Sequence, residues 1–495
     1  MTVLLPDAVL LLAVLLALIN ETMARVSTAE DSAPSNAGLR TYAIALGASG
    51  LAAFGYALTA ALDTQTYFFF SRMVVIDPFA AVIKAAIAAC FAVTLVYSRP
   101  YLEARHLLRG DLIMLAMFSL IGQCVMVSGA HFLTLYLGLE LMSLPLIAMI
   151  ALHRDSAQSL EAAMKYYVLS ALASGVLLYG ISMMYGATGA LSVDEVSRAL
   201  MTAPVNTKLL LLSVVCIIAG LAFKLGAAPF HLWVPDVYHG APAAATLLIG
   251  GAPKIAAFAW SLRILVSGLL PLAMDWQRML VIFAALSLVI GNLAGLAQRN
   301  IKRMLAYSAV AQMGFVLLGV LSGVVDGQTG GAANAYSAAM FYSLIYVLTA
   351  LGSFGVILAL SRRGFEADQL DDLKGLSQRR PMLAFVMMMM MFSLAGIPPT
   401  AGFYAKFSVL EALMGADFVW LAALAVMTSL VSAFYYLRAV KLMYFDAPRE
   451  CAPIMTTSSV RALLTMNGGA VLVLGLLPGP LMSICMHAIR HTLYS

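Results

Sequence analysis

Long apolar segments recur along the whole chain, and they constrain its fold more than any other feature. A helix needs about 20 mostly apolar residues to cross the hydrocarbon core of a bilayer, and fourteen segments of the 495-residue chain meet that requirement. Hydrophobic residues make up 62% of the sequence and charged residues only 11%, against about a quarter charged in a soluble domain. We therefore predict an all-α integral membrane protein with about fourteen transmembrane helices.

The predicted spans follow one another without a long polar insertion, so we expect one membrane domain over residues 1–495. The first span lacks a basic region before it and a clear cleavage site, so we interpret it as a retained helix and not as a signal peptide. The approximate spans are 4–20, 42–62, 74–97, 110–129, 131–152, 160–186, 208–233, 243–267, 278–298, 303–325, 335–361, 382–414, 418–444 and 460–487.

The loops between these spans differ in their content of lysine and arginine. Loops that follow odd-numbered spans hold 18 basic residues, and the opposite side, with both termini, holds 6. Because cytoplasmic loops are enriched in basic residues, this alternation predicts an even number of spans with both termini outside the cytoplasm.

Of the 29 basic residues, those 24 lie in loops or toward the ends of the predicted spans, and the five that we assign to span interiors are all lysines: Lys84, Lys165, Lys224, Lys254 and Lys406. A lysine can lose its proton when it is desolvated, whereas an arginine effectively cannot. A membrane interior with lysine and without arginine therefore favours proton exchange over fixed charge.

Glu140 and Lys224 lie deep in their segments, too far from either end to reach an interface easily. Ionisable residues in the membrane are costly and are functional candidates by default, although a structural ion pair is the alternative. Lys254 follows Gly250, Gly251 and a proline, which weaken its helix and leave room for water. Lys165 lies near the start of its span, where proton transfer and snorkelling to the headgroups are both open.

Two hydrophobic segments are broken, and each carries a deep lysine. Gly226 and Pro229 follow Lys224 in FKLGAAPFHLWVPDVYHGAP, and GIPPTAG precedes Lys406. Paired interruptions of this kind point to the translocation site in transporters, so we expect the two lysines to correspond in two repeats. His231, beside the first break, could relay protons or simply hydrogen-bond freed carbonyls.

Other classes of function lack support. The five cysteines lie far apart without a CxxC pair, and no nucleotide-binding, metalloprotease or serine-hydrolase motif is present. We therefore expect no cofactor or metal in this chain. The net charge of +5 is spread over loops and does not form the basic stripe that nucleic-acid binding requires.

The two broken segments resemble those of the antiporter-like membrane-arm subunits of respiratory complex I, the proton-pumping NADH:quinone oxidoreductase. The resemblance rests on FKLGAAPFHLWVPDVYHGAP with the lysine of GGAPKIAAF, on QRNIKRMLAYSAVAQMGF at 298–315 and on GIPPTAGFYAKFSVL at 396–410, and it covers roughly the whole chain. The HLWVPDVYHGAP form is similar to one branch of that family, subunit N, whereas branches M and L differ after the shared tryptophan and Pro-Asp pair.

The resemblance implies two inverted five-helix repeats, residues 110–267 (spans four to eight) and 278–444 (spans nine to thirteen), between spans one to three (1–109) and span fourteen (445–495). It implies that protons pass along a central axis carried by Glu140, Lys224, Lys254 and Lys406, with Lys165 modulating the Glu140–Lys224 pair. It also implies a bacterial inner membrane, neighbouring subunits M, K and J, and NADH, FMN, iron-sulfur clusters and quinone elsewhere in the complex.

Two rival functions remain at this point. A subunit of a multi-subunit sodium/proton antiporter or of a membrane-bound hydrogenase would share the ancestral fold, although the HLWVPDVYHGAP signature disfavours both. A structural spacer, in which the buried charges only fix helix packing, belongs to another class of function. The spacer predicts that neutral substitutions of similar size leave proton pumping intact.

Overall fold

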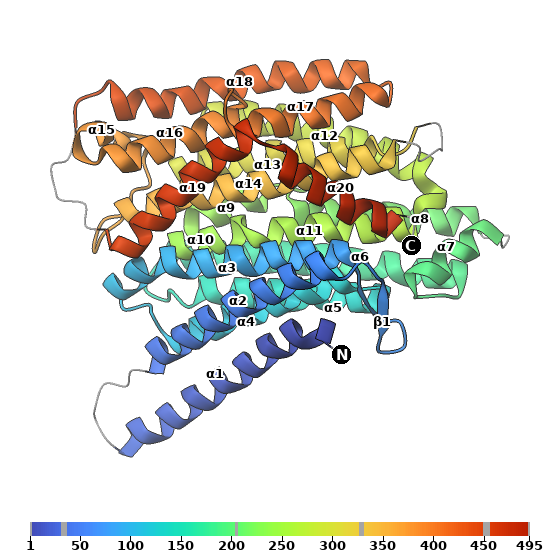
Figure 1. Ribbon diagram of the computed structural model, residues 1–495, viewed down its shortest axis with the longest axis horizontal. Coiled ribbons are helices and arrows are strands. Elements are labelled where there is room, and N and C mark those ends of the chain that lie inside the picture. The colour runs from blue at the N-terminus through green and yellow to red at the C-terminus, as the bar shows by residue number, and fades with distance from the viewer. Residues whose placement is uncertain (1, 31–36, 203–205, 326–330, 449–455, 494–495) are drawn as a thin grey trace.

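The computed structural model describes residues 2–30, 37–202, 206–325, 331–448 and 456–493, and within these the chain is almost entirely helical (Figure 1). The main helices of the first half are α1 (Leu5–Glu30), α2 (Ala37–Leu62), α3 (Pro78–Ala104), α4 (Gly110–Ser128), α5 (Phe132–Ala151), α6 (Ala157–Thr188), α8 (Thr207–Leu225), and α10 (Ala243–Gly250) with α11 (Ala252–Leu262), which together form one span. Those of the second half are α12 (Ala273–Leu296), α13 (Ile301–Leu321), α14 (Ala332–Leu360), α16 (Pro381–Ala395), α17 (Ala401–Gly415), α18 (Val419–Tyr444), α19 (Ser458–Leu476) and α20 (Gly479–Leu493).

Short elements connect or extend these helices. They are α7 (Val193–Thr202), α9 (Trp233–Gly240), α15 (Leu376–Arg379), the 3-10 turns Thr2–Leu4, Leu270–Leu272 and Leu370–Leu373, and a π-helical turn, Arg263–Gly268. The strands β1 (Tyr67–Phe69) and β2 (Val74–Ile76) form an antiparallel hairpin with Phe68 opposite Val75.

The predicted fold class is confirmed. Thirteen segments of the described chain are long and apolar enough to cross a membrane. The fourteenth prediction, 382–414, is the pair α16 and α17, two helices of 15 residues separated at Gly396–Thr400. Neither half reaches the length of a full span, because the glycine and the two prolines end the first half before the second begins.

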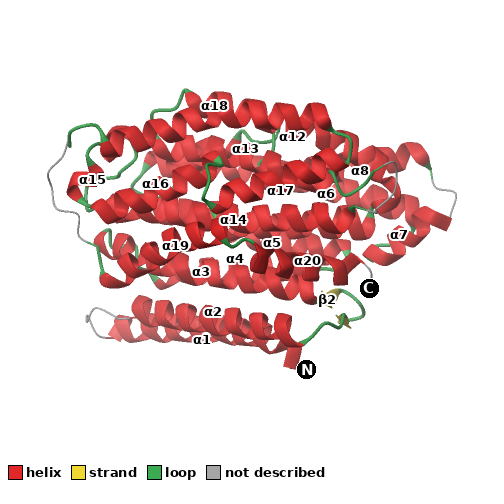
Figure 2. Cartoon of the chain, turned by 45° about the horizontal axis from the view of Figure 1, so that its top comes forward, coloured by secondary structure: helices red, strands yellow, loops and turns green. Residues whose placement is uncertain are grey.

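The most deeply buried helices lie in the middle of the bundle. The apolar stretches of Ala243–Gly268, α13 and α14 are 100%, 94% and 83% buried, whereas those of α1 and α2 are 22% and 28% buried. The helices run roughly side by side, with α1 and α2 at one edge and α18 at the opposite edge (Figures 1 and 2). Both ends of the chain lie at the same end of the bundle (Figure 1). Exposed apolar side chains on the outer helices suit contact with lipid or with other subunits.

Several predicted boundaries were wrong. Span three begins at Pro78 and not at residue 74, because Val74–Ile76 pairs in the hairpin and the Asp77 side chain caps the helix by accepting from Ala80 N at 2.8 Å. Span seven does not end at residue 233, because α9 continues it to Gly240. Span fourteen ends at Leu476, and Pro478 separates it from α20.

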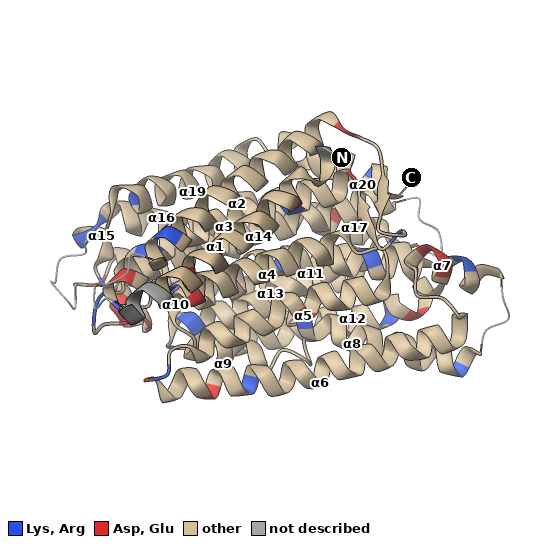
Figure 3. Ribbon diagram, turned by 90° about the horizontal axis from the view of Figure 1, so that it is seen from below, with Lys and Arg blue, Asp and Glu red and all other residues tan. Residues whose placement is uncertain are grey.

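Charged residues gather at the two ends of the bundle, with few between them (Figure 3). At the end that carries the termini, Arg263 donates to Asp77 at 2.7 Å, and both side chains are less than 10% exposed. Lys84, seven residues after Asp77 on the same helix, pairs with Asp7 of α1 at 2.9 Å. Lys84 therefore fastens α1 to α3.

Candidate functional site

The two helix breaks have the same local construction. In each, a half-helix ends at a glycine in the left-handed conformation, Gly226 with φ 75° and Gly396 with φ 82°. The residue after each glycine donates its backbone N–H back to the preceding turn, Ala227 to Ala222 at 2.8 Å and Ile397 to Phe392 at 2.9 Å. This is the usual C-terminal cap of a helix that ends in glycine, and it leaves the last carbonyls of each half-helix free for other partners.

A lysine ammonium takes one of these free carbonyls at each break. Lys254 Nζ donates to the Leu225 carbonyl at 2.8 Å, and Lys406 Nζ donates to the Ala395 carbonyl at 3.0 Å. Both carbonyls belong to the residue directly before the left-handed glycine. Lys406 also donates to Ser429 Oγ at 3.4 Å. Each ammonium lies 5.1–5.2 Å from an aromatic ring centroid, that of Trp233 for Lys254 and that of Phe315 for Lys406, a favourable arrangement for a desolvated cation.

These contacts differ from the expected correspondence between Lys224 and Lys406. Lys224 precedes its glycine by two residues, and the residue two before Gly396 is Leu394. By its contact with a break, Lys406 resembles Lys254, although Lys254 lies on α11 in the eighth span and Lys406 lies on α17, the second half of its own broken span. Lys224 lies on α8, the first half of its broken span, and its described bonds are to serines instead of a carbonyl at the break.

Lys224 is held by serines from two helices. Its ammonium donates to Ser143 Oγ of α5 at 2.8 Å and to Ser170 Oγ of α6 at 2.9 Å. Ser174, one turn along α6, donates to the carboxylate of Glu140. Among the described residues, Glu140 and Lys224 do not lie within 4 Å of each other as an ion pair. Each of the two expected partners therefore bonds to serine hydroxyl groups, and the two are not in direct contact.

Lys165 lies apart from that cluster. It pairs with Glu161 on its own helix at 2.8 Å and with Asp236 of α9 at 3.0 Å, and its side chain is 45% exposed. It precedes Ser170 by five residues, a rise of about 7.5 Å along a helix.

His231 lies in the first break and is buried, and its Nδ1 has no hydrogen-bond partner among the described residues. Its ring faces Tyr307 with the centroids 6.4 Å apart. Within the described chain no lysine bonds to it, so the lysines and His231 do not form one connected chain.

A buried group of hydroxyl and amide side chains, missed by the sequence interpretation, approaches the second break. Tyr342 donates to Gln312 Oε1, and Gln312 Nε2 donates to Tyr436 Oη and to the Leu394 carbonyl, each at 3.3 Å. Tyr436 in turn bonds Ser308 Oγ at 2.5 Å. The Leu394 carbonyl directly precedes the one that holds Lys406, so this group ends beside that lysine.

Two further tyrosines extend the polar group toward the first repeat. Tyr346 lies one turn from Tyr342 on α14, and Tyr238 lies on α9 with a buried hydroxyl that has no hydrogen-bond partner among the described residues. The Tyr238 hydroxyl lies against Gly250, because a Cβ added there would meet it at 3.1 Å. Gly250 precedes Lys254 by four residues. The i,i+4 spacing of Tyr342 and Tyr346 within an apolar helix was the sequence signal that could have revealed this face.

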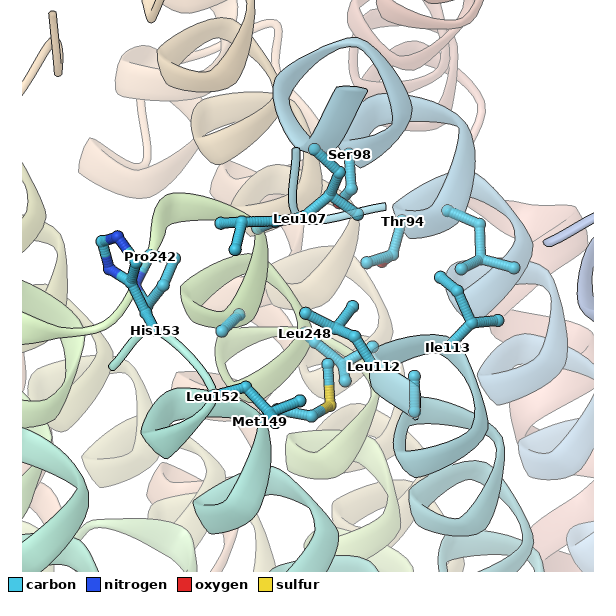
Figure 4. Close-up of a pocket in the computed structure, with 15 residues that line it drawn as sticks. Thr94, Ser98, Leu107, Leu112, Ile113, Met149, Leu152, His153, Pro242 and Leu248 are labelled. Atoms are coloured by element: carbon cyan, nitrogen blue, oxygen red, sulfur yellow. The ribbon is translucent and has the colours of Figure 1, made fainter. Parts of the chain in front are cut away.

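A narrow cavity of about 30 Å³ lies away from these residues, between α3, α4, α5 and α10 (Figure 4). Its walls are mostly apolar, with Leu112, Met149 and Leu248 among them and His153 at one side. None of the candidate lysines lines it. Among the described residues no group of three or more His, Cys, Asp or Glu side chains is placed to hold a metal ion.

The sequence of the chain is similar to that of known membrane proteins over most or all of its length. Residues 129–432 match the family model described as NADH:quinone oxidoreductase/Mrp antiporter, TM. The chain is 61% identical over 494 residues to NADH-quinone oxidoreductase subunit N of Paraburkholderia phymatum, covering 100% of this chain and 99% of that protein. It is 59% identical over 431 residues to subunit N of Cupriavidus taiwanensis, covering 87% and 88%.

The chain belongs to the subunit N family of NADH-quinone oxidoreductase. It is therefore a multi-pass membrane subunit of bacterial complex I, and other complex I subunits are its partners. A chain of respiratory complex I from Thermus thermophilus matches its structure with a TM-score of 0.80 at 30% identity, covering 99% of this chain and 100% of that one.

The shared fold alone does not separate subunit N from its rivals. A chain of the Mrp complex from Dietzia matches with a TM-score of 0.83 at 19% identity, covering 99% of this chain and 98% of that one. The long, close sequence matches to subunit N make the distinction that the HLWVPDVYHGAP form predicted.

Proposed function

We propose that this subunit N translocates protons across the bacterial inner membrane through its buried lysines, driven by quinone reduction elsewhere in the complex. The single observation that carries the proposal is the pair of helix breaks, at each of which a buried lysine donates to the last carbonyl of a half-helix. An ammonium held by a carbonyl and by hydroxyls, without a carboxylate in contact, can give up its proton without leaving an unpaired anion behind.

In the first half of the pathway, the charge of Glu140 acts on Lys224 across the serines of α5 and α6. Hydroxyl groups both donate and accept, so Ser143, Ser170 and Ser174 can reorient when the charge on either partner changes. When quinone chemistry changes the local field, protonated Lys224 is less stabilised and passes its proton toward Lys254. Lys165 and His231 remain candidate contributors to this half.

In the second half, the proton passes from Lys254 toward Lys406 along the buried tyrosines, with water at the breaks. Tyr238, Tyr346 and Tyr342 line the way from Gly250 to Gln312, whose amide reaches the carbonyl next to that of Lys406. Tyrosine hydroxyls can accept one proton while donating another. The amide side chain of Gln312 fixes the orientation of the tyrosine hydroxyl groups that bond to it.

The proposal includes the placement of the subunit. The end with most basic loops faces the cytoplasm and both termini face the periplasm, following the charge asymmetry. Subunits M, K and J are the proposed neighbours. NADH, FMN, the iron-sulfur clusters and quinone bind to other subunits.

Proton pumping by inverted membrane vesicles tests the proposal. Lys224→Met and Lys406→Met preserve side-chain length but cannot hold a proton, so we expect assembled complexes whose pumping per NADH oxidised falls steeply. Lys208→Met is the matched control, because Lys208 is exposed at the start of the same helix as Lys224. Undiminished pumping in both buried variants would instead support a structural spacer.

A further inference from the structure

The Pro-Asp pair of HLWVPDVYHGAP contributes an aspartate that the proposed pathway does not use. Asp236 lies on α9, the second half of the first broken helix, and it is shared between two cations. Its Oδ2 lies 3.0 Å from Lys165 Nζ of α6, and its Oδ1 lies 3.3 Å from an Arg303 nitrogen of α13. Helix α6 belongs to the first predicted repeat and α13 to the second.

The C-terminal end of α9 also contacts both α6 and α13. Ser159 of α6 donates to the Gly240 carbonyl at 2.9 Å, and Lys302 of α13 donates to the Ala241 carbonyl at 3.3 Å. His239, on the same turn, meets Gln158 of α6 at 3.2 Å. Helix α9 is thus held between the two repeats at two levels, and Asp236 makes the charged contact to both.

The start of α9 lies close to the lysines of the pathway. Trp233 donates its indole N–H to the Phe223 carbonyl, beside Lys224, at 3.0 Å, and its ring stacks on Tyr166 of α6 with centroids 4.7 Å apart. The same ring faces the ammonium of Lys254 at 5.2 Å. Tyr238 of α9 begins the tyrosine path toward Gln312. A shift of this short helix would therefore change the surroundings of Lys254.

We propose that Asp236 is a positioning residue that couples the two repeats, because its ion pairs with Lys165 and Arg303 set the position of α9 against Lys254. An isolated pair of partly exposed charges stabilises little, but a carboxylate shared by two cations forms a network, which is the exception. When Lys165 moves away, Asp236 is left to Arg303, and the change reaches Trp233 and Tyr238 through α9. This inference rests on the proposed function and adds a control point to it.

A double-mutant cycle tests the coupling. Asp236→Asn in the intact complex is expected to lower the rate of proton pumping by about fivefold, the effect of roughly 1 kcal/mol, while assembly is retained. Asp236→Glu, which keeps the charge, should restore most of the rate. In a Lys165→Gln, Arg303→Gln background, which already lacks both partners, Asp236→Asn should cause no further loss.

The control variant is Asp194→Asn, which removes an equally short but exposed ion pair with Arg72 at 3.0 Å near the other end of the bundle. It should pump normally.

If Asp236→Asn pumps at the normal rate, or lowers the rate equally in both backgrounds, the inference is overturned. Failure of the proposed function has a different signature, which is undiminished pumping in Lys224→Met. If Asp236→Asn does not assemble, the Lys165→Gln, Arg303→Gln variant alone should show the same loss of pumping, and normal pumping by it overturns the inference.

Discussion

Gln312 is the residue on which the polar contacts near the second break converge. Its amide oxygen accepts from Tyr342, and its amide nitrogen donates to Tyr436 and to the Leu394 carbonyl. All of these groups are buried, so no bulk water can replace a lost partner. An unpaired buried polar group costs about 1–3 kcal/mol, which is enough to change which hydroxyl orientation dominates.

Replacement of Gln312 by leucine should therefore disturb proton transfer more than assembly. We expect the pumping rate of the Gln312→Leu complex to fall about tenfold, the equivalent of ~1.4 kcal/mol, as measured by acidification of inverted vesicles after NADH addition. Gln298→Leu is the control, since the side chain of Gln298, just beyond the end of α12, donates to the Ala294 carbonyl of that helix at 2.9 Å, away from the tyrosine group. Equal effects of the two substitutions would contradict a role for Gln312 in the pathway.

At the scale of elements, Gly226 matters for its conformation and for its neighbour. A Cβ at Gly226 would lie 2.8 Å from Val234 and 3.2 Å from the ammonium of Lys254. Gly189 has a similar φ of 70° but open space around it. Substitution at both glycines causes backbone strain, but only substitution at Gly226 also crowds Lys254. Comparison of the two variants therefore distinguishes the two effects.

Alanine at either position should cost roughly 1–2 kcal/mol of stability, because the left-handed conformation is unfavourable for a residue with a Cβ. Gly226→Ala should also lower pumping, whereas Gly189→Ala should not. Thermal unfolding of the purified complex measures the first effect and vesicle pumping measures the second. Normal pumping by Gly226→Ala would show that the break tolerates displacement of Lys254.

The sequence revealed the elements better than it revealed their contacts. Both breaks were predicted, since glycine and proline end a helix by local rules that need no partner. The β-hairpin and α7 were missed because they lie between apolar segments and have weak patterns of their own. The deep lysines could be found as charges within apolar segments, but their partners could not. Whether Lys224 meets Glu140 or Ser143 depends on the packing of α5, α6 and α8.

At the scale of the molecule, one buried ion pair joins distant parts of the chain. Asp77 caps α3 and accepts from Arg263 at the end of the eighth span and from Thr492 of α20 at 3.2 Å. Burial raises the pKa of Asp77, but the Arg263 guanidinium and the hydrogen bonds outweigh it, and the net pKa is lowered. A carboxyl group whose pKa is lower in the folded state stabilises the fold at pH values above its unfolded pKa of about 3.9. This stabilisation is lost as the pH falls through the folded-state pKa.

Asp77→Asn should destabilise the subunit by about 3–5 kcal/mol, because it leaves a buried arginine without its counterion. Thermal dissociation of the subunit from the purified complex measures this loss. The difference from wild type should be constant between pH 6 and 8, where Asp77 is fully ionised. Glu103→Gln removes an exposed pair with Arg99 at 2.8 Å and should cost less than about 1 kcal/mol. A similar small cost for Asp77→Asn would contradict the anchoring role.

The ratio of protons translocated to NADH oxidised in a Lys224→Arg complex tests the central claim most directly. Arginine keeps the positive charge and much of the length of lysine but cannot release its proton in a protein. If Lys224 carries a transported proton, the ratio should fall in Lys224→Arg and stay at the wild-type value in the exposed Lys208→Arg control. An unchanged ratio in an assembled Lys224→Arg complex would show that the charge alone is needed and would contradict the account.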